Sequence, residues 1–588
     1  MSCSQRSISA MRVSGRGVLP GIAIQFYLTL AHLDRMGARG LLRWSLGACV
    51  FTCRTSSRTT KGSRLMNVIK TPEVATKEGK VQGLVEGKIS VFRGIPYAMP
   101  PTGALRWKAP ERATPWPGVR EAFNFGFSAY QSRQACIEAG GGDPGEMHED
   151  CLFLNVWTPK LDAGAKLPVV FWIHGGAFVI GSGRLPPYEG IHLASRDVVL
   201  VTFNYRLGHL GFFMHPALEK ENPGGPANFG LLDQVLALEW VRDNIARFGG
   251  DPGNVTVMGQ SAGAKSVLSL FTSPQVREKN LFRRGVAMSA YVLQEKPLAD
   301  ARLAGMAFAW RNGLDRLLAT MKDLRELGPE KFWMLPADTA NAPSPIYGDS
   351  VLPEPIRETF ARGEQLSLPL ILGSTSDDSS VVSSFGIDPA TILERLGAFA
   401  ESIRQLYPDV DDDREIGRRM CRDFVFTVMP RLLATRHAER GAAVWRYYFE
   451  YRAKMLAPRQ RLGVPHGGEV PYFLETAADV PPTGALFTEE DGTFMRHLVD
   501  SLVQFARTGA PGPVAQVSWE GHTETQDRLL RLDGSPQGVT DFERDILQAA
   551  ENLMPFLDSL AKPPPPKLPR ATSAAATASS NTRQEGRP

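Results

Sequence analysis

The sequence has 588 residues, of which 43% are hydrophobic and 22% are charged, so its composition is that of an ordinary globular protein with a sizeable core. Its net charge of +4 is uneven, because residues 1–65 carry ten basic residues against one acid, residues 562–588 carry five against one, and residues 66–561 carry 51 against 60. A nucleic-acid-binding domain needs a basic face on its folded part, so the acidic centre argues against that class.

The first segment, residues 1–65, is rich in Arg and Ser and is not expected to belong to the folded domain. Its apolar stretch Val18–Ala31 is interrupted by Pro20, Gly21 and Gln25 and is too short to span a bilayer, so we expect no transmembrane anchor. The segment resembles a weak secretory signal; the alternative is that translation starts at Met66. Export and a cytoplasmic location therefore both stay open.

Residues 66–561 are predicted to form one domain, because this stretch has no linker-like change of composition and no internal repeat. Apolar runs without polar alternation predict strands buried on both faces of a mostly parallel sheet. A helical spacing of apolar residues at 231–248 predicts a crossover helix between two of these strands. The four predicted strands are Val169–Ile173, Val198–Asn204, Val255–Met258 and Leu368–Leu372.

The six cysteines are too few and too scattered for a disulfide-rich scaffold, and no two CxxC pairs indicate zinc, so we expect no structural metal. Cys136 and Cys151 enclose a Gly-rich, acidic loop. In an oxidising compartment a disulfide bond between them would stabilise the fold by about 3 kcal/mol. Two free thiols are the alternative.

A glycine pair follows the first predicted strand, in the segment His174–Phe178. This segment matches the HGGG-type element of esterases and lipases, whose backbone amides stabilise an oxyanion. A Gly pair after a strand is more often a simple turn. If the element is catalytic, Gly175, Gly176 and the amide of Ala262 would form an oxyanion hole with three donors.

The sequence Gly259–Gly263 has the GxSxG spacing, directly after the predicted strand Val255–Met258 and before a helical stretch. A sharp turn between strand and helix presents the serine hydroxyl to a substrate, and the flanking glycines avoid clashes. Ser261 is therefore the candidate nucleophile.

A serine nucleophile needs an imidazole base and a carboxylate that orients it, here expected downstream in the order Ser, acid, His. Of the later histidines, His466 lies in a loop-like setting, while His437 and His497 fall in helical patterns. The acid is expected after the strand that ends at Leu372, where Asp377 and Asp378 stand. Because the base must be neutral, activity should fall at acidic pH.

Together these motifs resemble the type-B carboxylesterases, which are related to cholinesterases and bile-salt-activated lipases. The resemblance covers about residues 70–560 and implies the α/β-hydrolase fold, with a mostly parallel central sheet, helices on both faces and helical cap insertions. Besides HGGAF and GQSAG, it is carried by Phe92–Ala98, Glu149–Val156, Asn204–Gly208, Asn228–Gln234 and Phe248–Pro252.

The resemblance implies Ser261 as nucleophile, His466 as general base and then acid, and Asp378 as the third member of the triad. Two departures bear on Asp378: the family's acid is usually Glu, and the Gly that follows it is Ser379 here. Asp377 is the alternative. Ser289 matches a family position thought to support the acid; an ordinary polar loop residue is the alternative.

The expected activity is hydrolysis of a small-molecule ester through an acyl-enzyme, with no cofactor. In the family, the interval from Cys136 to Cys151 often forms a disulfide loop, and cholinesterases carry a choline-binding Trp in it. The interval here has no Phe, Trp or Tyr, which disfavours a quaternary ammonium substrate. Residues 291–342 are expected to cover the acyl or alcohol pocket, or simply to pack in the core.

Two other functions stay open. One is a non-catalytic adhesion or scaffold protein, and the other is a triad enzyme that acts on carbamates or amides or transfers acyl groups. Retention of the Ser, the His, an acid and the oxyanion glycines favours catalysis over the first. The oligomeric state and the physiological ester are not predicted. Residues 562–588, with Pro563–Pro566 and an Ala/Ser/Thr tract, are predicted to be a disordered tail.

Overall fold

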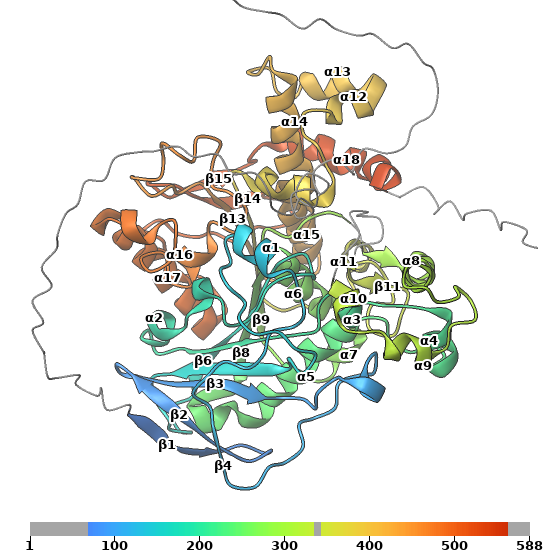
Figure 1. Cartoon of the computed structure of the whole chain (residues 1–588). Coiled ribbons are helices and arrows are strands. Elements are labelled where there is room, and N and C mark those ends of the chain that lie inside the picture. The colour runs from blue at the N-terminus through green and yellow to red at the C-terminus, as the bar shows by residue number, and fades with distance from the viewer. Residues whose placement is uncertain (1–68, 294, 334–342, 562–588) are drawn as a thin grey trace, which may run out of the picture.

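The computed structural model describes residues 69–293, 295–333 and 343–561 (Figure 1). The predictions for residues 1–65 and 562–588 therefore lie outside the described residues. No helix in the described part is long and apolar enough to cross a membrane.

A large sheet runs through the molecule in the order β1-β2-β3-β5-β7-β6-β8-β9-β12-β13-β14-β15, with β4 paired to β2. From β7 to β14 every neighbouring pair is parallel. The four predicted strands all lie in this parallel block, as expected. Its members are β7 (Val199–Phe203), β6 (Leu167–Ile173), β8 (Gly250–Gln260), β9 (Arg284–Met288), β12 (Leu370–Thr375), β13 (Val444–Phe449) and β14 (Arg528–Leu532).

Antiparallel strands extend the sheet at both edges, which the sequence did not predict. At one edge are β1 (Lys70–Ala75), β2 (Lys80–Glu86), β3 (Ile89–Pro96) and β5 (Phe153–Thr158), with β4 (Val119–Glu121) parallel to β2; β15 (Gln537–Thr540) forms the other. A separate parallel pair joins β10 (Lys296–Pro297) to β11 (Ile346–Tyr347).

Burial of both sheet faces explains the apolar runs. All seven residues of β6 are buried, and alternate side chains enter different cores. Phe171 packs into one hydrophobic cluster and Trp172 into a second, because successive side chains of a strand point to opposite faces. The sheet therefore lies between two layers of apolar packing.

Helices cover both faces (Figure 1). The first cluster receives apolar side chains from α5 (Phe229–Asn244), α6 (Ala262–Thr272) and α15 (Val428–Ala438), and the second from α2 (Ile191–Ala194), α16 (Val470–Phe473) and α17 (Glu489–Thr508). The predicted crossover helix is α5 followed by a 3-10 turn, η3 (Ile245–Phe248). These layers fix the α/β architecture.

The remaining helices are mostly short and lie in insertions and connections, apart from the last one, which follows β15 and packs on the first cluster. They are α1 (Arg133–Glu138), α3 (Gly208–Gly211), α4 (Pro216–Glu221), α7 (Pro274–Arg277), α8 (Leu298–Arg311), α9 (Met321–Glu326), α10 (Glu330–Trp333), α11 (Ile356–Ala361), α12 (Ile392–Leu396), α13 (Ala400–Arg404), α14 (Asp413–Cys421) and α18 (Arg544–Ala561). Short 3-10 turns are η1 (Gly103–Leu105), η2 (Pro186–Tyr188), η5 (Asp378–Phe385), η6 (Gly397–Phe399) and η8 (Gly484–Leu486), and a π-helical turn, η7 (Arg422–Thr427), joins α14 to α15.

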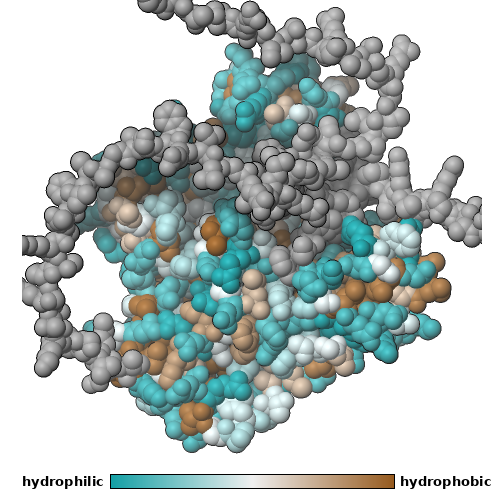
Figure 2. All heavy atoms as spheres, in the orientation of Figure 1, coloured by the Kyte–Doolittle hydropathy of each residue, from teal (hydrophilic) through white to brown (hydrophobic). Residues whose placement is uncertain are grey.

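The face in Figure 2 is mixed, with hydrophilic residues between separate hydrophobic patches. Hydrophobic surface gathers at the right-hand edge, over the region of α8 and α9, where Trp310, Leu317 and Leu318 are exposed.

Candidate active site

The turn from β8 to α6 holds Ser261 in an unusual backbone conformation. Ser261 has φ 58° and ψ −119°, which a residue with a Cβ adopts only under strain. Its amide donates to Met288 O at 2.9 Å, and its carbonyl accepts from Lys265 at 3.0 Å, so the strained residue is tied to β9 and α6. The side chain is buried, with 6% of the residue exposed.

Two glycines allow the turn to pack against the end of β6. A Cβ on Gly263 would lie 2.1 Å from Ile173 O, and a Cβ on Gly175 would lie 2.6 Å from Gln260 O and 3.3 Å from Ser261 Cβ. Both contacts are too close for any larger residue. The glycines therefore bring the loop after β6 directly against the candidate nucleophile.

The predicted oxyanion donors lie at this contact. Within the described residues, the amides of Gly175, Gly176 and Ala262 have no hydrogen-bond acceptor. Ala262 is the first residue of α6, where helix amides have no partner inside the helix. Gly176 has φ 105°, and Ala177 and Phe178 that follow also have positive φ. Unpaired amides next to a serine can stabilise a developing oxyanion.

His174, at the start of this loop, is held by Tyr205. Its ring stacks on Tyr205 with centroids 4.4 Å apart, and the Tyr205 hydroxyl donates to His174 O at 2.9 Å. Burial lowers the pKa of His174 to about 4. The imidazole is therefore neutral at physiological pH, and it supports the loop as an uncharged aromatic ring.

His466 and Asp378 are in direct contact. His466 Nδ1 lies 2.7 Å from Asp378 Oδ1, and the other oxygen, Oδ2, accepts from the amide of Thr375 at 2.7 Å. Asp378 is fully buried at the end of β12. The loop after β12 that holds Asp377 and Asp378 (the acid loop) is bonded to the loop that holds His466 (the histidine loop). Asp377 N donates to Val464 O at 2.9 Å. This explains how residues 88 positions apart meet.

The second nitrogen of His466 contacts Gln260. Gln260 Nε2 lies 3.1 Å from His466 Nε2, and within the described residues no hydrogen bond joins Ser261 Oγ to His466. When Nδ1–H donates to Asp378, Nε2 is the acceptor and the Gln260 amide is the donor. Gln260 therefore contacts the imidazole nitrogen that would accept the serine proton in a Ser-His-Asp triad. Catalytic hydrogen bonds are often long or poorly aligned in free enzymes and form only with the substrate.

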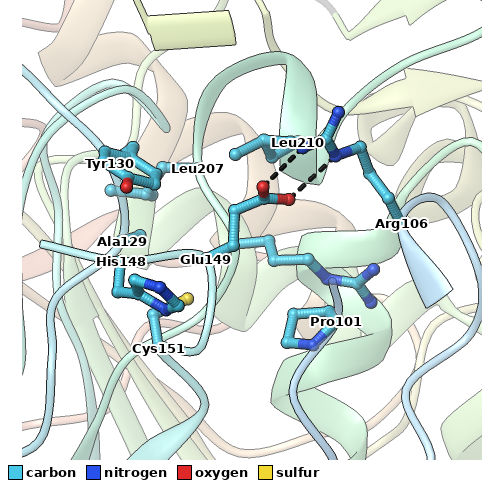
Figure 3. A pocket seen from close by; sticks show the side chains of 10 residues that line it. Pro101, Arg106, Ala129, Tyr130, His148, Glu149, Cys151, Leu207 and Leu210 are labelled. Carbon is cyan, nitrogen blue, oxygen red and sulfur yellow. Dashed lines mark hydrogen bonds and ion pairs between the residues drawn. The ribbon is translucent and has the colours of Figure 1, made fainter. Parts of the chain in front are cut away.

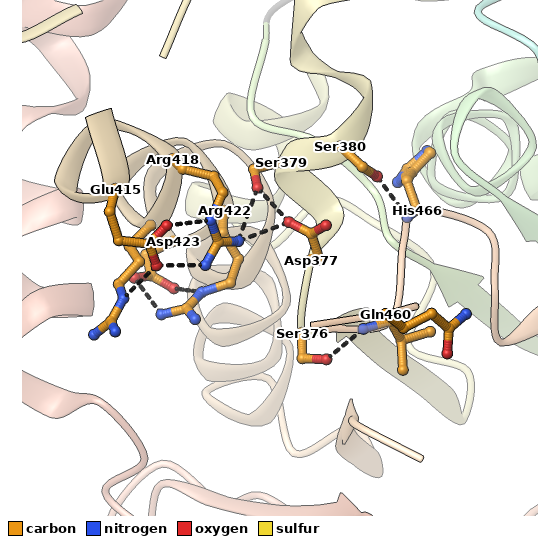
Figure 4. Close-up of polar contacts among 12 residues, drawn as sticks. Ser376, Asp377, Ser379, Ser380, Glu415, Arg418, Arg422, Asp423, Gln460 and His466 are labelled. Carbon is orange, nitrogen blue, oxygen red and sulfur yellow. Dashed lines mark hydrogen bonds and ion pairs between the residues drawn. The ribbon is translucent and has the colours of Figure 1, made fainter. Parts of the chain in front are cut away.

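Asp377 is directed away from His466. Its Oδ1 accepts from Arg418 Nη1 and from Ser379 Oγ, each at 2.7 Å, while Ser380 Oγ accepts from the amide of His466 at 2.9 Å (Figure 4). Burial raises the pKa of Asp377 above its ordinary value, against the opposing effect of Ser379 and Arg418. Of the two candidate acids, only Asp378 contacts the histidine in the described part of the chain.

A second carboxyl near the site, that of Glu469, is fully buried. The sequence analysis gave this residue no role. Ser289 Oγ donates to Glu469 Oε1 at 3.1 Å, so Ser289 contacts this carboxyl. Burial, and then the negative charge of Asp378, raise the pKa of Glu469 to about 8. Its place three residues after His466, in the His-Gly-Gly-Glu sequence, was the one available signal.

Cys136 and Cys151 are both buried free thiols in this structure, so the disulfide considered above is not formed here. Cys151 lies at a small pocket beside His148 and the Arg106–Glu149 ion pair (Figure 3). Arg106 Nε donates to Glu149 Oε2 at 2.8 Å. Burial raises the pKa of Cys136 to about 11 and that of Cys151 well above its ordinary value, which disfavours the reactive thiolate.

The other predicted features have the following outcomes. His437 lies in α15 and His497 in α17, as their helical patterns indicated. The predicted pocket cover, residues 291–342, is described except for residue 294 and residues 334–342.

Comparison with known proteins decides the family. The sequence profile of the carboxylesterase family matches residues 70–549. The chain belongs to the carboxylesterase family. This carboxylesterase is 33% identical over 470 residues to the fumonisin B1 esterase of Sphingopyxis macrogoltabida, covering 76% of this chain and 83% of the relative. It is 33% identical over 481 residues to the para-nitrobenzyl esterase of Bacillus subtilis (strain 168), covering 78% and 94%.

Further comparisons agree with the α/β-hydrolase fold. The acetylcholinesterase of Bungarus fasciatus is 31% identical over 515 residues, covering 79% of this carboxylesterase and 83% of the relative. A solved structure of PNB esterase matches with a TM-score of 0.69 at 30% identity, covering 81% of this chain and 99% of that structure. The chain is therefore an ester hydrolase of the α/β-hydrolase fold that acts on small-molecule esters.

Proposed function

We propose that this carboxylesterase hydrolyses its ester through a covalent acyl-enzyme on Ser261, with His466 and Asp378 completing the triad. The observation that carries the proposal is the 2.7 Å contact between His466 Nδ1 and Asp378 Oδ1. It leaves Nε2 as the proton acceptor of the imidazole, beside a strained serine at the β8–α6 turn. Asp378, and not Asp377, is the proposed acid.

In the first half-reaction, the Gln260 amide leaves His466 Nε2 and the Ser261 hydroxyl takes its place. Ser261 Oγ attacks the ester carbonyl carbon and its proton passes to Nε2. The carbonyl oxygen becomes an oxyanion that accepts hydrogen bonds from the amides of Gly175, Gly176 and Ala262. The intermediate collapses, the alkoxy oxygen takes the proton from His466, and the alcohol leaves an acyl-serine behind.

In the second half-reaction, His466 accepts a proton from water while the water oxygen attacks the acyl carbon. The same three amides stabilise the second oxyanion, and the C–O bond to Ser261 breaks as His466 returns the proton to Oγ. The carboxylic acid is released and the serine is restored. No cofactor enters either half-reaction.

Glu469 and Ser289 are proposed to support the site electrostatically. A buried carboxyl with a pKa raised to about 8 is protonated at neutral pH, so it adds no second negative charge beside Asp378. The relatives' names, fumonisin B1 esterase and para-nitrobenzyl esterase, support carboxylic esters as the substrate class.

The test is burst-phase hydrolysis of short- and medium-chain p-nitrophenyl esters by the wild type and by Ser261→Ala. We expect the wild type to release one equivalent of p-nitrophenol rapidly before steady turnover, because acylation by an activated aryl ester should be faster than deacylation, so the acyl-enzyme accumulates. The variant should lose the burst and lose turnover by about 10³-fold or more. A burst that persists in Ser261→Ala would contradict the proposed nucleophile.

A further inference from the structure

A second cavity, of about 400 Å³, adjoins the acid loop, where Ser376 and Arg418 line it. It is formed where β12, β13 and β14 end: Ser376 follows β12, Glu450 follows β13 and Asp533 follows β14. The rest of the lining comes from α14, from the first residue of η7, from Arg531 of β14 and from the loop between β13 and Val464. Ligands of parallel α/β sheets commonly bind at the carboxyl ends of the strands, so the position suits a binding site.

The lining is rich in arginine although the domain is acidic. Three carboxylates face the cavity, at Glu415, Glu450 and Asp533. They are outnumbered by six arginines, at positions 418, 419, 422, 452, 461 and 531. Residues 66–561 as a whole carry more acids than bases, so this concentration of guanidinium groups departs from the rest of the domain. Four of these arginines, at positions 418, 419, 422 and 531, are paired with carboxylates, so the uncompensated positive charge of the lining lies on Arg452 and Arg461. These two side chains favour negatively charged ligands.

The deeper arginines are held by carboxylates. Arg418 Nε lies 2.8 Å from Glu415 Oε2, and Arg419 Nε lies 3.0 Å from the other oxygen (Figure 4 shows Arg418 between Glu415 and Asp377). Hydrogen bonding from Arg418, together with Arg419, lowers the pKa of Glu415 to about 2. Arg531 pairs with Glu450. These ion pairs fix the walls of the cavity.

Two arginines at the cavity have no carboxylate partner among the described residues. Arg452 Nη1 donates to Gln460 O at 3.0 Å, and Arg461 Nε donates to Pro458 O at 3.3 Å, and both side chains are exposed. A guanidinium has five N–H donors, so most of their hydrogen-bonding capacity is unused. A planar fork of donors fits a carboxylate or phosphate group in a bidentate manner.

We propose that this cavity binds a small anion with at least two negatively charged carboxylate or phosphate groups, held by Arg452 and Arg461. The two unpaired guanidinium groups supply the contacts for two such groups, and the cavity volume suits a small molecule. This second site is separate from ester hydrolysis. It borders the acid loop through Arg418, which lines the cavity and also donates to Asp377.

The test measures binding of citrate and of pyrophosphate to the full-length protein by calorimetry at constant ionic strength, with acetate as a singly charged comparison. We expect citrate, pyrophosphate or both to bind, and acetate to bind far more weakly. The anion that binds tells whether carboxylate or phosphate geometry is preferred. Because binding is read by heat and not by turnover, Ser261→Ala should bind as the wild type does even if the proposed nucleophile is wrong.

The decisive variant is Arg452→Gln/Arg461→Gln, which should weaken binding at least tenfold with an unchanged melting temperature. Its matched control is Arg247→Gln/Arg283→Gln, which removes two exposed arginines that also donate only to backbone carbonyls in the described structure. These precede β8 and β9, at the opposite ends of parallel strands. Binding within about twofold of wild type is expected there. No binding to the wild type, or equal weakening in both double variants, would overturn the proposal.

Discussion

At the scale of single residues, the site depends on the different contacts that two adjacent aspartates make. Asp378 is fully buried and contacts His466, whereas Asp377 is held by Arg418 and Ser379. Asp378 contacts the imidazole although Asp is shorter than the Glu that is usual in the family, because the acid and histidine loops are joined through Asp377 N and Val464 O. Ser379, which replaces the family's usual Gly, finds a partner in Asp377.

These contacts predict different effects of the two isosteric variants. Asp378→Asn should lower kcat/KM by about 10³ to 10⁴-fold, because the amide cannot hold His466 in the tautomer that accepts the serine proton. Asp377→Asn should lower it by less than about tenfold. Kinetics with p-nitrophenyl acetate, with melting temperatures as a folding control, measure both. A larger loss in Asp377→Asn would show that the acid is assigned to the wrong residue.

Glu469 predicts a pH dependence of stability. Its pKa is about 8 in the folded protein against an ordinary value of 4.5, so between these values the folded state holds a proton that the unfolded state has lost. Stability from this group is therefore present at low pH and is lost as pH rises through about 5 to 8. The Gln variant, Glu469→Gln, has no such proton to lose.

We expect the free energy of unfolding of the wild type to fall, relative to Glu469→Gln, by roughly 3 kcal/mol between pH 5 and pH 8. Denaturant unfolding of both proteins across this range measures the difference. Parallel stability curves for the two proteins would mean that Glu469 is not protonated at neutral pH.

At the scale of elements, the active site depends on close packing between the loop after β6 and the turn from β8 to α6. Gly175 and Gly263 leave no room for a side chain at this contact. The sequence predicted both elements, because GxSxG and the Gly pair each follow an apolar run. It did not predict the role of Gln260, since no spacing argument says which way that side chain turns.

This packing predicts that Gly263→Ala is destabilising. The added Cβ would lie 2.1 Å from Ile173 O, so the backbone must move, and we expect a loss of about 1–3 kcal/mol of stability. Esterase activity should fall as well, because Gly175 lies two residues from the displaced carbonyl. Gly538→Ala in β15 is the control, since its Cβ would meet no atom within 4 Å. Equal unfolding free energies in the two variants, measured with denaturant, would contradict the packing argument.

At the scale of the whole molecule, the parallel centre of the sheet was predictable and its edges were not. β6, β7 and β12 are completely buried, and each contains a run of apolar residues that the sequence shows. β13 escaped notice because it contains Arg446, which is buried and paired with Asp527. β1 has only two buried residues and includes the exposed Lys70 and Glu73, so it gives no such run.

The site follows the same division. Ser261, His466 and the oxyanion glycines stand in local motifs, whereas the contact of Glu469 with Ser289 and the arginine cavity join segments that are distant in sequence. No local pattern joins such segments. The Cys136–Cys151 interval suggested a disulfide as one option, but both thiols are free here. That residues 66–561 form the whole catalytic domain stays a prediction.

The most direct test of the central claim is mass spectrometry of the acyl-enzyme, quenched in acid within milliseconds of mixing with p-nitrophenyl acetate. We predict an acetyl group on the peptide that contains Ser261, present during turnover and absent once the ester is consumed. The adduct should be missing from Ser261→Ala and should form far more slowly in His466→Ala. An acetyl group carried by a different residue, or steady turnover with no adduct at Ser261, would contradict the proposed mechanism.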